Sequence, residues 1–165
     1  DIDYRGVIYA GLIITPVGDP KVIEFNCRFG DPETQVVLPL LATPLDTIML
    51  ACCEQRLGQL PPVGWKLGYA ACVVMAAEGY PGPYPKGMAI VGLEAATLTG
   101  SMVFLAGTQL NKGELTANGG RILGVTALGE GFGAAIANAY TAVAEIQFNH
   151  AYYRRDIGHR VSDRV

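Results

Sequence analysis

Residues 21–35 read KVIEFNCRFGDPETQ, and this stretch decides how the first part of the chain folds. Apolar and polar side chains alternate along it, which predicts a β-strand over residues 21–28. An apolar run rich in β-branched residues precedes it at residues 6–14, and the PVGDP segment at residues 16–20 is a typical turn sequence. The two runs and the turn together predict a β-hairpin.

The alternation places the polar side chains Glu24, Asn26 and Arg28 on one face of the predicted strand. A carboxylate and an amide oxygen suit Mg²⁺, and an arginine one step further along can hold a phosphate. Metal and phosphate in line along one strand suit phosphoryl transfer. A polar face is also the ordinary solvent side of an antiparallel sheet, so both interpretations stay open here. The opposite face, which we expect to face the core, carries Ile23, Phe25 and Cys27.

The rest of the chain predicts helices first and strands later. Residues 29–32 predict a loop, the apolar residues through Leu41 a short helix, and the residues from Pro44 to Gly58 a second helix. The GQLPPVGWK segment at 58–66 is the best domain boundary, because its prolines and glycines disfavour regular structure. We therefore expect domains at residues 1–62 and 63–165. In the second domain, a buried strand is expected at 69–77 and further strands at 88–92, 102–106 and 121–128. Residues 79–87 are expected to be irregular and residues 153–160 to form a polar tail.

Residues 130–147 predict one amphipathic helix. Its apolar side is expected to consist of Phe132, Ile136, Tyr140, Val143 and Ile146.

Composition excludes several classes of protein. Of the 165 residues, 50% are hydrophobic and 16% charged, with a net charge of −3, which excludes a disordered chain, a coiled coil and a nucleic-acid binder that relies on positive charge. The longest apolar run, residues 69–77, is far shorter than the roughly 20 residues of a membrane span. We expect a cytoplasmic protein with neither nucleic acid nor membrane as partner.

The four cysteines lack CxxC spacing and both histidines lie near the end of the chain, so no zinc site is expected and the thiols should be reduced and buried. The low charge fraction and a start at Asp1 suggest a piece of a larger protein. We expect such a piece to expose apolar patches and to self-associate.

The octet RFGDPETQ at residues 28–35 resembles the signature of the phosphoribosylamine–glycine ligase (glycinamide ribonucleotide synthetase) family. The preceding VIEFNCR resembles the last metal-binding strand of the ATP-grasp fold. The resemblance implies an α/β (α+β) chain in which residues 1–62 complete an ATP-grasp sheet with two helices. A small, mainly antiparallel sheet or partial barrel with one packed helix would follow. Later blocks match the family's C-terminal domain in the same order: VVMAAEGYPG (73–82), AGT (106–108), GGRIL and VTALG (within 119–129) and RRDIGHR (154–160).

Members of this family join glycine to 5-phosphoribosylamine in de novo purine biosynthesis and split ATP to ADP and phosphate through an acyl phosphate. The resemblance implies that Glu24 and Asn26 bind Mg²⁺ or Mn²⁺ and that Arg28 steadies the transferred phosphoryl group. It further implies that Gly30 allows close backbone approach to a substrate and that Asp31 grips the glycine ammonium or the sugar amine.

Two other residues have alternative roles under the same resemblance, and a further pair of residues is expected to be structural. Glu33 is either a substrate contact or only a charge at a helix N-terminus. Arg121 either helps to hold the sugar phosphate or is a plain surface arginine. Arg155 and Asp156 are expected to form a structural ion pair that pins the tail.

The sequence departs from the family pattern in two ways. Many ATP-grasp relatives carry a further metal-binding glutamate on the preceding strand, whereas residues 4–18 contain no acid. The family's N-terminal, nucleotide-binding part has no counterpart here, so that part would be the missing partner and the chain alone is expected to be inactive. The alternative is a non-catalytic interaction or scaffold module that keeps the fold; a carboxylase of purine synthesis is disfavoured because RFGDPET is not its motif. The ligase interpretation requires Glu24, Asn26 and Arg28 to project into one shared space.

Overall fold

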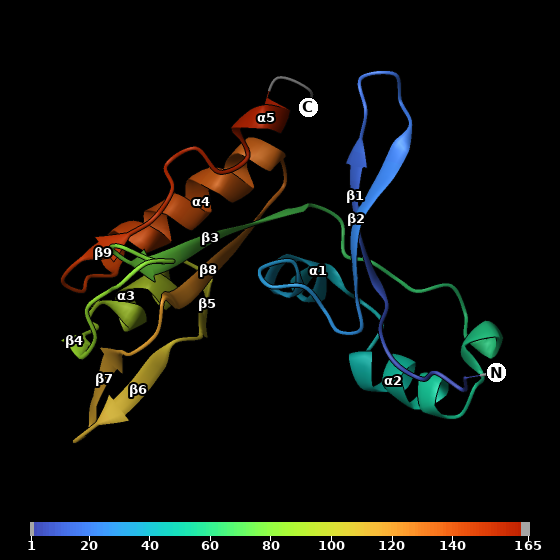
Figure 1. Ribbon diagram of the computed structural model, residues 1–165, viewed down its shortest axis with the longest axis horizontal. Coiled ribbons are helices and arrows are strands. Elements are labelled where there is room, and N and C mark those ends of the chain that lie inside the picture. Colours follow the sequence, from blue (N-terminus) through green and yellow to red (C-terminus); the bar gives the residue numbers. More distant parts are fainter. Residues whose placement is uncertain (1, 163–165) are drawn as a thin grey trace. The chain divides into compact units, whose positions relative to one another are not determined.

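A computed structural model describes residues 2–162 of the chain. They fall into two compact units, Asp1–Lys66 and Leu67–Val165, and each unit is described by itself below (Figure 1). The described part of the chain combines α-helices with three antiparallel sheets, which confirms the predicted mixed fold class. All three sheets are open, so the partial barrel considered from the sequence is not formed in this part of the chain.

The first unit is built on an antiparallel hairpin of β1 (Tyr9–Ile14) and β2 (Pro20–Asn26). The predicted hairpin is therefore confirmed, with shorter strands. The register shifts by one residue opposite Gly11 and Leu12, which leaves Ile23 as the extra residue of a β-bulge. Because β2 ends at Asn26, Arg28 lies in the bend that follows, and its predicted place on the strand is wrong.

The expectation that Ile23, Phe25 and Cys27 face a core is wrong for this chain. Ile23 is 68% exposed and Phe25 66% exposed, and Cys27 is exposed as well. Among the described residues of the first unit, only Gly30 and Ala51 are buried. The hairpin carries further exposed apolar side chains, so self-association of this chain stays a prediction. These side chains are Ile8, Leu12, Ile13, Ile14, Val17 and Val22.

Two short helices follow the hairpin, as predicted: α1 (Thr34–Leu40) and α2 (Leu45–Cys53). The second ends earlier than expected, and a 3₁₀ turn, η1 (Leu57–Gln59), occupies the rest of the predicted helix. Arg5 donates a hydrogen bond to the carbonyl oxygen of Cys53 at the end of α2, where a cation opposes the negative end of the helix dipole. None of the four cysteines forms a disulfide bond, but Cys27 and Cys53 are exposed, contrary to the buried thiols expected.

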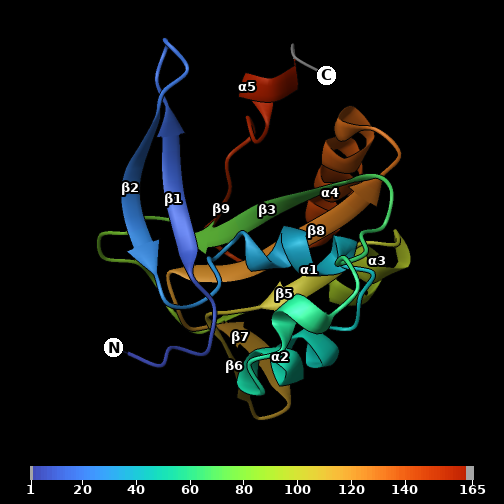
Figure 2. The same cartoon turned by 90° about the vertical axis from the view of Figure 1, so that its right-hand side faces the viewer.

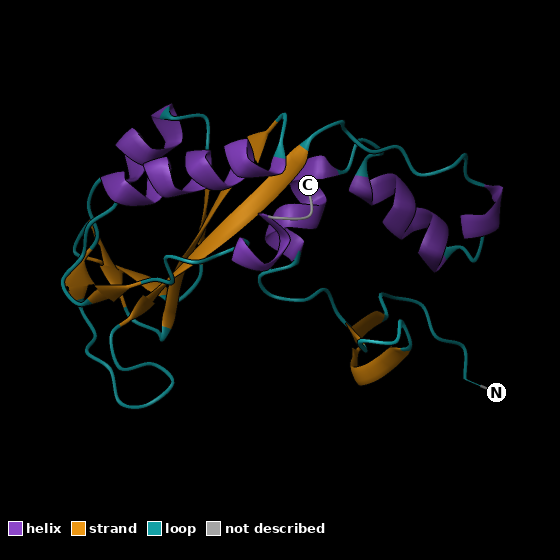
Figure 3. Cartoon of the chain, turned by 90° about the horizontal axis from the view of Figure 1, so that it is seen from above, coloured by secondary structure: helices purple, strands orange, loops and turns teal. Residues whose placement is uncertain are grey.

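The second unit contains a four-stranded sheet in the order β5-β8-β3-β9, with one long helix packed on it (Figures 2 and 3). Strand β3 (Tyr69–Ala77) has the predicted bounds, and β8 (Arg121–Gly129) and β5 (Met102–Leu105) lie close to theirs. Along β3, every second side chain from Ala71 to Ala77 is buried, whereas the side chains between them are half-buried, so only one face belongs to the core. The largest fully buried side chains are Met75, Ile122, Leu123, Val73, Val125, Val143 and Thr126.

Helix α4 (Phe132–Glu145) is the predicted amphipathic helix, but its buried face differs from the one expected. Ala135, Ala139 and Ala142 are completely buried and lie toward the sheet, together with Val143. Phe132, Ile136 and Tyr140 flank this face and are half-buried. Small side chains allow a helix to approach a sheet closely, and the larger apolar residues then close the sides of the contact.

The sequence missed several short elements of the second unit. The clearest is the hairpin of β6 (Thr108–Asn111) and β7 (Glu114–Ala117), whose turn residues Lys112 and Gly113 both have positive φ, as in a type I′ turn. Strand β7 also pairs with the two-residue β4 (Met88–Ala89), which is shorter than the strand predicted at 88–92 but lies within it. The other missed elements are α3 (Leu93–Leu98), β9 (Ala151–Tyr152) and α5 (His159–Ser162).

Replacing Gly92 by alanine is expected to destabilise the second unit strongly. A Cβ at Gly92 would lie 1.8 Å from the backbone oxygen of Glu145 at the end of α4, and φ is +85° there. We expect a loss of about 3 kcal/mol or more, measured as thermal unfolding by circular dichroism. Gly113→Ala is the matched control, because φ is +88° but nothing lies within 4 Å; it should cost only about 1 kcal/mol. Equal losses for the two variants would contradict the packing argument.

Candidate functional site

Polar side chains gather on one face of the hairpin in the first unit. Asn26 lies opposite Tyr9 in the ladder and Glu24 lies opposite Gly11, so these four residues belong to the same face. The Asn26 amide nitrogen donates a hydrogen bond to Oε1 of Glu24 at 3.1 Å. The two residues expected as metal ligands therefore lie side by side, with Glu24 exposed and Asn26 half-buried.

Gly11 leaves the room that the Glu24 side chain occupies. A Cβ at Gly11 would lie 3.2 Å from Cγ of Glu24 and 3.7 Å from a ring carbon of Tyr9. Alternation of apolar and polar residues does not by itself mark Gly11 as a site residue. The signal that could have found it is a glycine within a β-branched strand, because such a glycine often marks a bulge or a close approach.

Glu33 joins this face from the loop after β2. The Tyr9 hydroxyl donates a hydrogen bond to Oε1 of Glu33 at 3.0 Å, and this bond is the main reason that the pKa of Tyr9 is raised. The other carboxylate oxygen, Oε2, occupies the space over Gly30, where an added Cβ would lie only 2.3 Å from it. Glu33 stands at the N-cap of α1, yet its side chain makes no capping hydrogen bond.

Arg28 and Asp31 flank the same region from the bend and turn that follow β2. The Arg28 guanidinium donates to the carbonyl oxygen of Phe29 at 2.9 Å, so the backbone of the bend orients it. Its charge lowers the pKa of Tyr9 whereas the charge of Glu24 raises it, which places both charges near the phenol. One carboxylate oxygen of Asp31 accepts a hydrogen bond from the Gln35 amide at 2.9 Å.

The oxygen donors of this face suit a metal ion that is also bound by a second molecule, such as a nucleotide. They are too few to hold a metal ion by themselves. Nowhere in residues 2–162 do three His, Cys, Asp or Glu side chains come close enough to hold a metal ion by themselves. Glu24 and Asn26 supply one carboxylate and one amide, which are hard oxygen donors. Mg²⁺ is commonly held by one or two protein oxygens together with water and substrate phosphates, and this pair fits that pattern.

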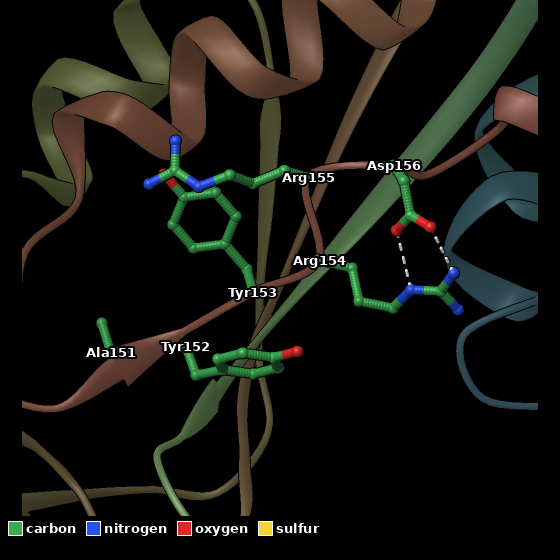
Figure 4. Close-up of a pocket in the computed structure, with 6 residues that line it drawn as sticks. All are labelled: Ala151, Tyr152, Tyr153, Arg154, Arg155 and Asp156. Carbon is green, nitrogen blue, oxygen red and sulfur yellow. Dashed lines mark hydrogen bonds and ion pairs between the residues drawn. The ribbon is translucent and has the colours of Figure 1, made fainter.

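The ion pair in the tail of the second unit involves a different arginine from the one expected. Arg154, not Arg155, forms a two-pronged pair with Asp156, at 2.9 and 2.8 Å, and lowers the pKa of that carboxyl group (Figure 4). Arg155 instead lies over the ring of Tyr153, at 5.4 Å from its centroid. The Tyr140 hydroxyl fixes the tail to α4, because it donates to the carbonyl oxygen of Arg154 and accepts from the Ile157 N–H.

Arg121 is the first residue of β8 in the second unit. The two glycines before it have a packing role. A Cβ at Gly119 would lie 2.7 Å from the Cα of Gly107, and one at Gly120 would lie 2.0 Å from the Tyr80 ring. The glycine pair alone is therefore no sign of a phosphate site.

Within the described residues, no helix is long and apolar enough to span a membrane.

Comparisons with known proteins agree on one family. Residues 70–160 match the family described as "Phosphoribosylglycinamide synthetase, C domain", and residues 1–34 match its "ATP-grasp (A) domain". The phosphoribosylamine–glycine ligase of Nostoc sp. is 60% identical over 98% of this chain, which covers 38% of that protein. The trifunctional purine biosynthetic protein adenosine-3 of Gallus gallus is 51% identical over 96% of the chain, which covers 16% of it.

A solved structure gives the same result. The crystal structure of phosphoribosylamine–glycine ligase from Thermotoga maritima matches 90% of this chain with a TM-score of 0.78 and 36% sequence identity. This chain covers 36% of that one. The chain thus spans well under half the length of the relatives that it matches.

Proposed function

Because this chain belongs to the phosphoribosylglycinamide synthetase family, we propose that it is the carboxyl-terminal part of an ATP-dependent ligase that joins glycine to 5-phosphoribosylamine. Family membership implies the use of ATP. The observation that carries the proposal is the hydrogen-bonded pair of Glu24 and Asn26 on one hairpin face, with Glu33 held beside it by Tyr9. The cytoplasmic location expected from the sequence remains a prediction.

The reaction begins when the glycine carboxylate takes the γ-phosphoryl group of ATP and forms an acyl phosphate. The amine of 5-phosphoribosylamine then attacks the acyl carbon, the amide bond forms and phosphate leaves. The electrostatic obstacle is the approach of an anionic carboxylate to a triphosphate. A bound Mg²⁺ or Mn²⁺ supplies the positive charge that offsets this repulsion. Glu24 and Asn26 would hold it, with nucleotide oxygens and water as its remaining ligands.

Arg28 and Asp31 would act on either side of this centre. Arg28 brings a permanent positive charge to the same region, where it would steady the phosphoryl group in flight. Asp31, in the turn between β2 and α1, supplies a carboxylate that would hold the glycine ammonium or the sugar amine. Gly30 lets the backbone come close to a substrate, and Arg121 of the second unit remains a candidate for the sugar phosphate.

The test is a steady-state assay of a longer protein that joins this chain to the N-terminal part found in its relatives. With Mg²⁺ and ATP, we expect ADP and phosphate to form only when both glycine and 5-phosphoribosylamine are present, with one amide product per ATP. Mass spectrometry identifies the product as glycinamide ribonucleotide. ADP release that does not depend on glycine would contradict the proposal, and the absence of any ADP release would favour the alternative of a non-catalytic module.

A further inference from the structure

Tyr9 has no role in the proposed site so far, although its hydroxyl lies at the centre of the group. It stands on β1 directly opposite Asn26 and therefore shares the face of the two proposed metal ligands. Its hydroxyl reaches out of the hairpin to the loop and donates to Oε1 of Glu33 at 3.0 Å. No capping bond or ion pair of Glu33 accompanies this contact among the described interactions, so Tyr9 is what orients the carboxylate.

The second carboxylate oxygen of Glu33 is held in a defined place. Oε2 lies over Gly30, in space that any other residue at this position would fill with its Cβ. Gly30 is one of the few buried residues of this unit, so the floor below Oε2 is closed. Tyr9 on one side and Gly30 on the other thus hold the Glu33 carboxylate in one place.

Glycine and 5-phosphoribosylamine both carry an amine, but the two amines differ in charge during the reaction. This difference in charge decides which of them the Glu33 carboxylate suits. The ammonium group of glycine is permanently positive near neutral pH and needs an anionic partner when it leaves water. The sugar amine must be neutral when it attacks, so it gains less from a carboxylate than a charged ammonium does. The carboxylate of glycine, which accepts the phosphoryl group, is separated from the ammonium by a single carbon. The ammonium site must therefore lie close to the metal ligands, and Glu33 is held by Tyr9, which shares their hairpin face.

We infer that Tyr9 is a positioning residue that orients Glu33 to bind the ammonium group of glycine. The inference rests on the proposed function and assigns one part of the substrate to one carboxylate. Tyr9 itself touches no substrate; it acts through Glu33, and Glu33 sets the affinity for glycine rather than the rate of phosphoryl transfer.

The experiment uses the full-length enzyme and its KM for glycine. We expect Glu33→Gln to raise this KM roughly 10- to 100-fold, because a charge-assisted hydrogen bond is lost, and Tyr9→Phe to raise it about fivefold. In both variants kcat and the KM for ATP should change less than about twofold, since the metal ligands are untouched. In the Glu33→Gln background, Tyr9→Phe should have almost no further effect, because the two changes act on one interaction.

Tyr4→Phe is the matched control. Tyr4 lies in the same unit and donates its hydroxyl to the carbonyl oxygen of Val7 at 2.8 Å, but it makes no contact with Glu33. It should leave the KM for glycine unchanged. If Tyr9→Phe behaves like Tyr4→Phe, or if the effects of Tyr9→Phe and Glu33→Gln simply multiply, the inference is wrong while the ligase proposal stands. A wild-type enzyme that does not ligate glycine would instead refute the proposed function.

Discussion

Replacing Glu24 by glutamine in the full-length enzyme is expected to lower kcat/KM for ATP about a thousandfold. Glutamine has the same length, and its amide oxygen can still accept the hydrogen bond from Asn26, so the hairpin face should keep its shape. What disappears is the negative charge of one of only two proposed protein ligands of the metal. The metal ion is then bound more weakly, so the repulsion between the triphosphate and the incoming carboxylate is less well neutralised.

The measurement is a titration of ATP at fixed free Mg²⁺ and again at fixed Mn²⁺. Glu54→Gln serves as the control, because Glu54 is an exposed carboxylate at the end of α2 that pairs with Arg56. It should change the rate less than about twofold. A Glu24→Gln enzyme that retains more than about a fifth of the wild-type rate, with an unchanged melting temperature, would remove Glu24 from the metal site.

The 165-residue chain by itself is expected to show no ATP-dependent ligation of glycine. Its proposed ligands lie on a two-stranded hairpin whose Glu24 is open to water, and water weakens the electrostatic effects that the reaction needs. The apolar side chains of the same hairpin, Ile23 and Phe25 among them, have no core to pack on in this unit. An isolated two-stranded hairpin is at best marginally stable, so the ligands would also be poorly held.

A coupled assay for ADP with about 10 µM of the chain and roughly 1 mM of each substrate tests this expectation. The full-length enzyme is the positive control. Mixing the chain with the separately produced N-terminal part of a relative shows whether the missing surface can be restored in trans. Glycine-dependent ADP release by the chain alone, above about 1% of the full-length rate, would show that the active centre is complete within these 165 residues.

The amino-acid sequence alone determined the elements whose signals are local. The hairpin, β3 and α4 follow from alternation, turn residues and helical periodicity, and these depend on neighbours in the chain. The same alternation predicted that Glu24 and Asn26 share a face, because side chains two apart in a strand point the same way. The RFGDPETQ segment identified the family by its resemblance alone, because such a signature depends only on the order of residues.

Only the tertiary structure decided which surfaces are covered and which distant groups meet. The face of Phe25 was expected to be buried because it is apolar, but burial depends on a partner surface, and this unit supplies none. The buried face of α4 consists of three alanines and Val143, because the distance between helix and sheet, which periodicity does not contain, selects mostly small side chains. The bond between Tyr9 and Glu33 joins residues 24 positions apart, and it exists only because the hairpin and the loop fold back on each other.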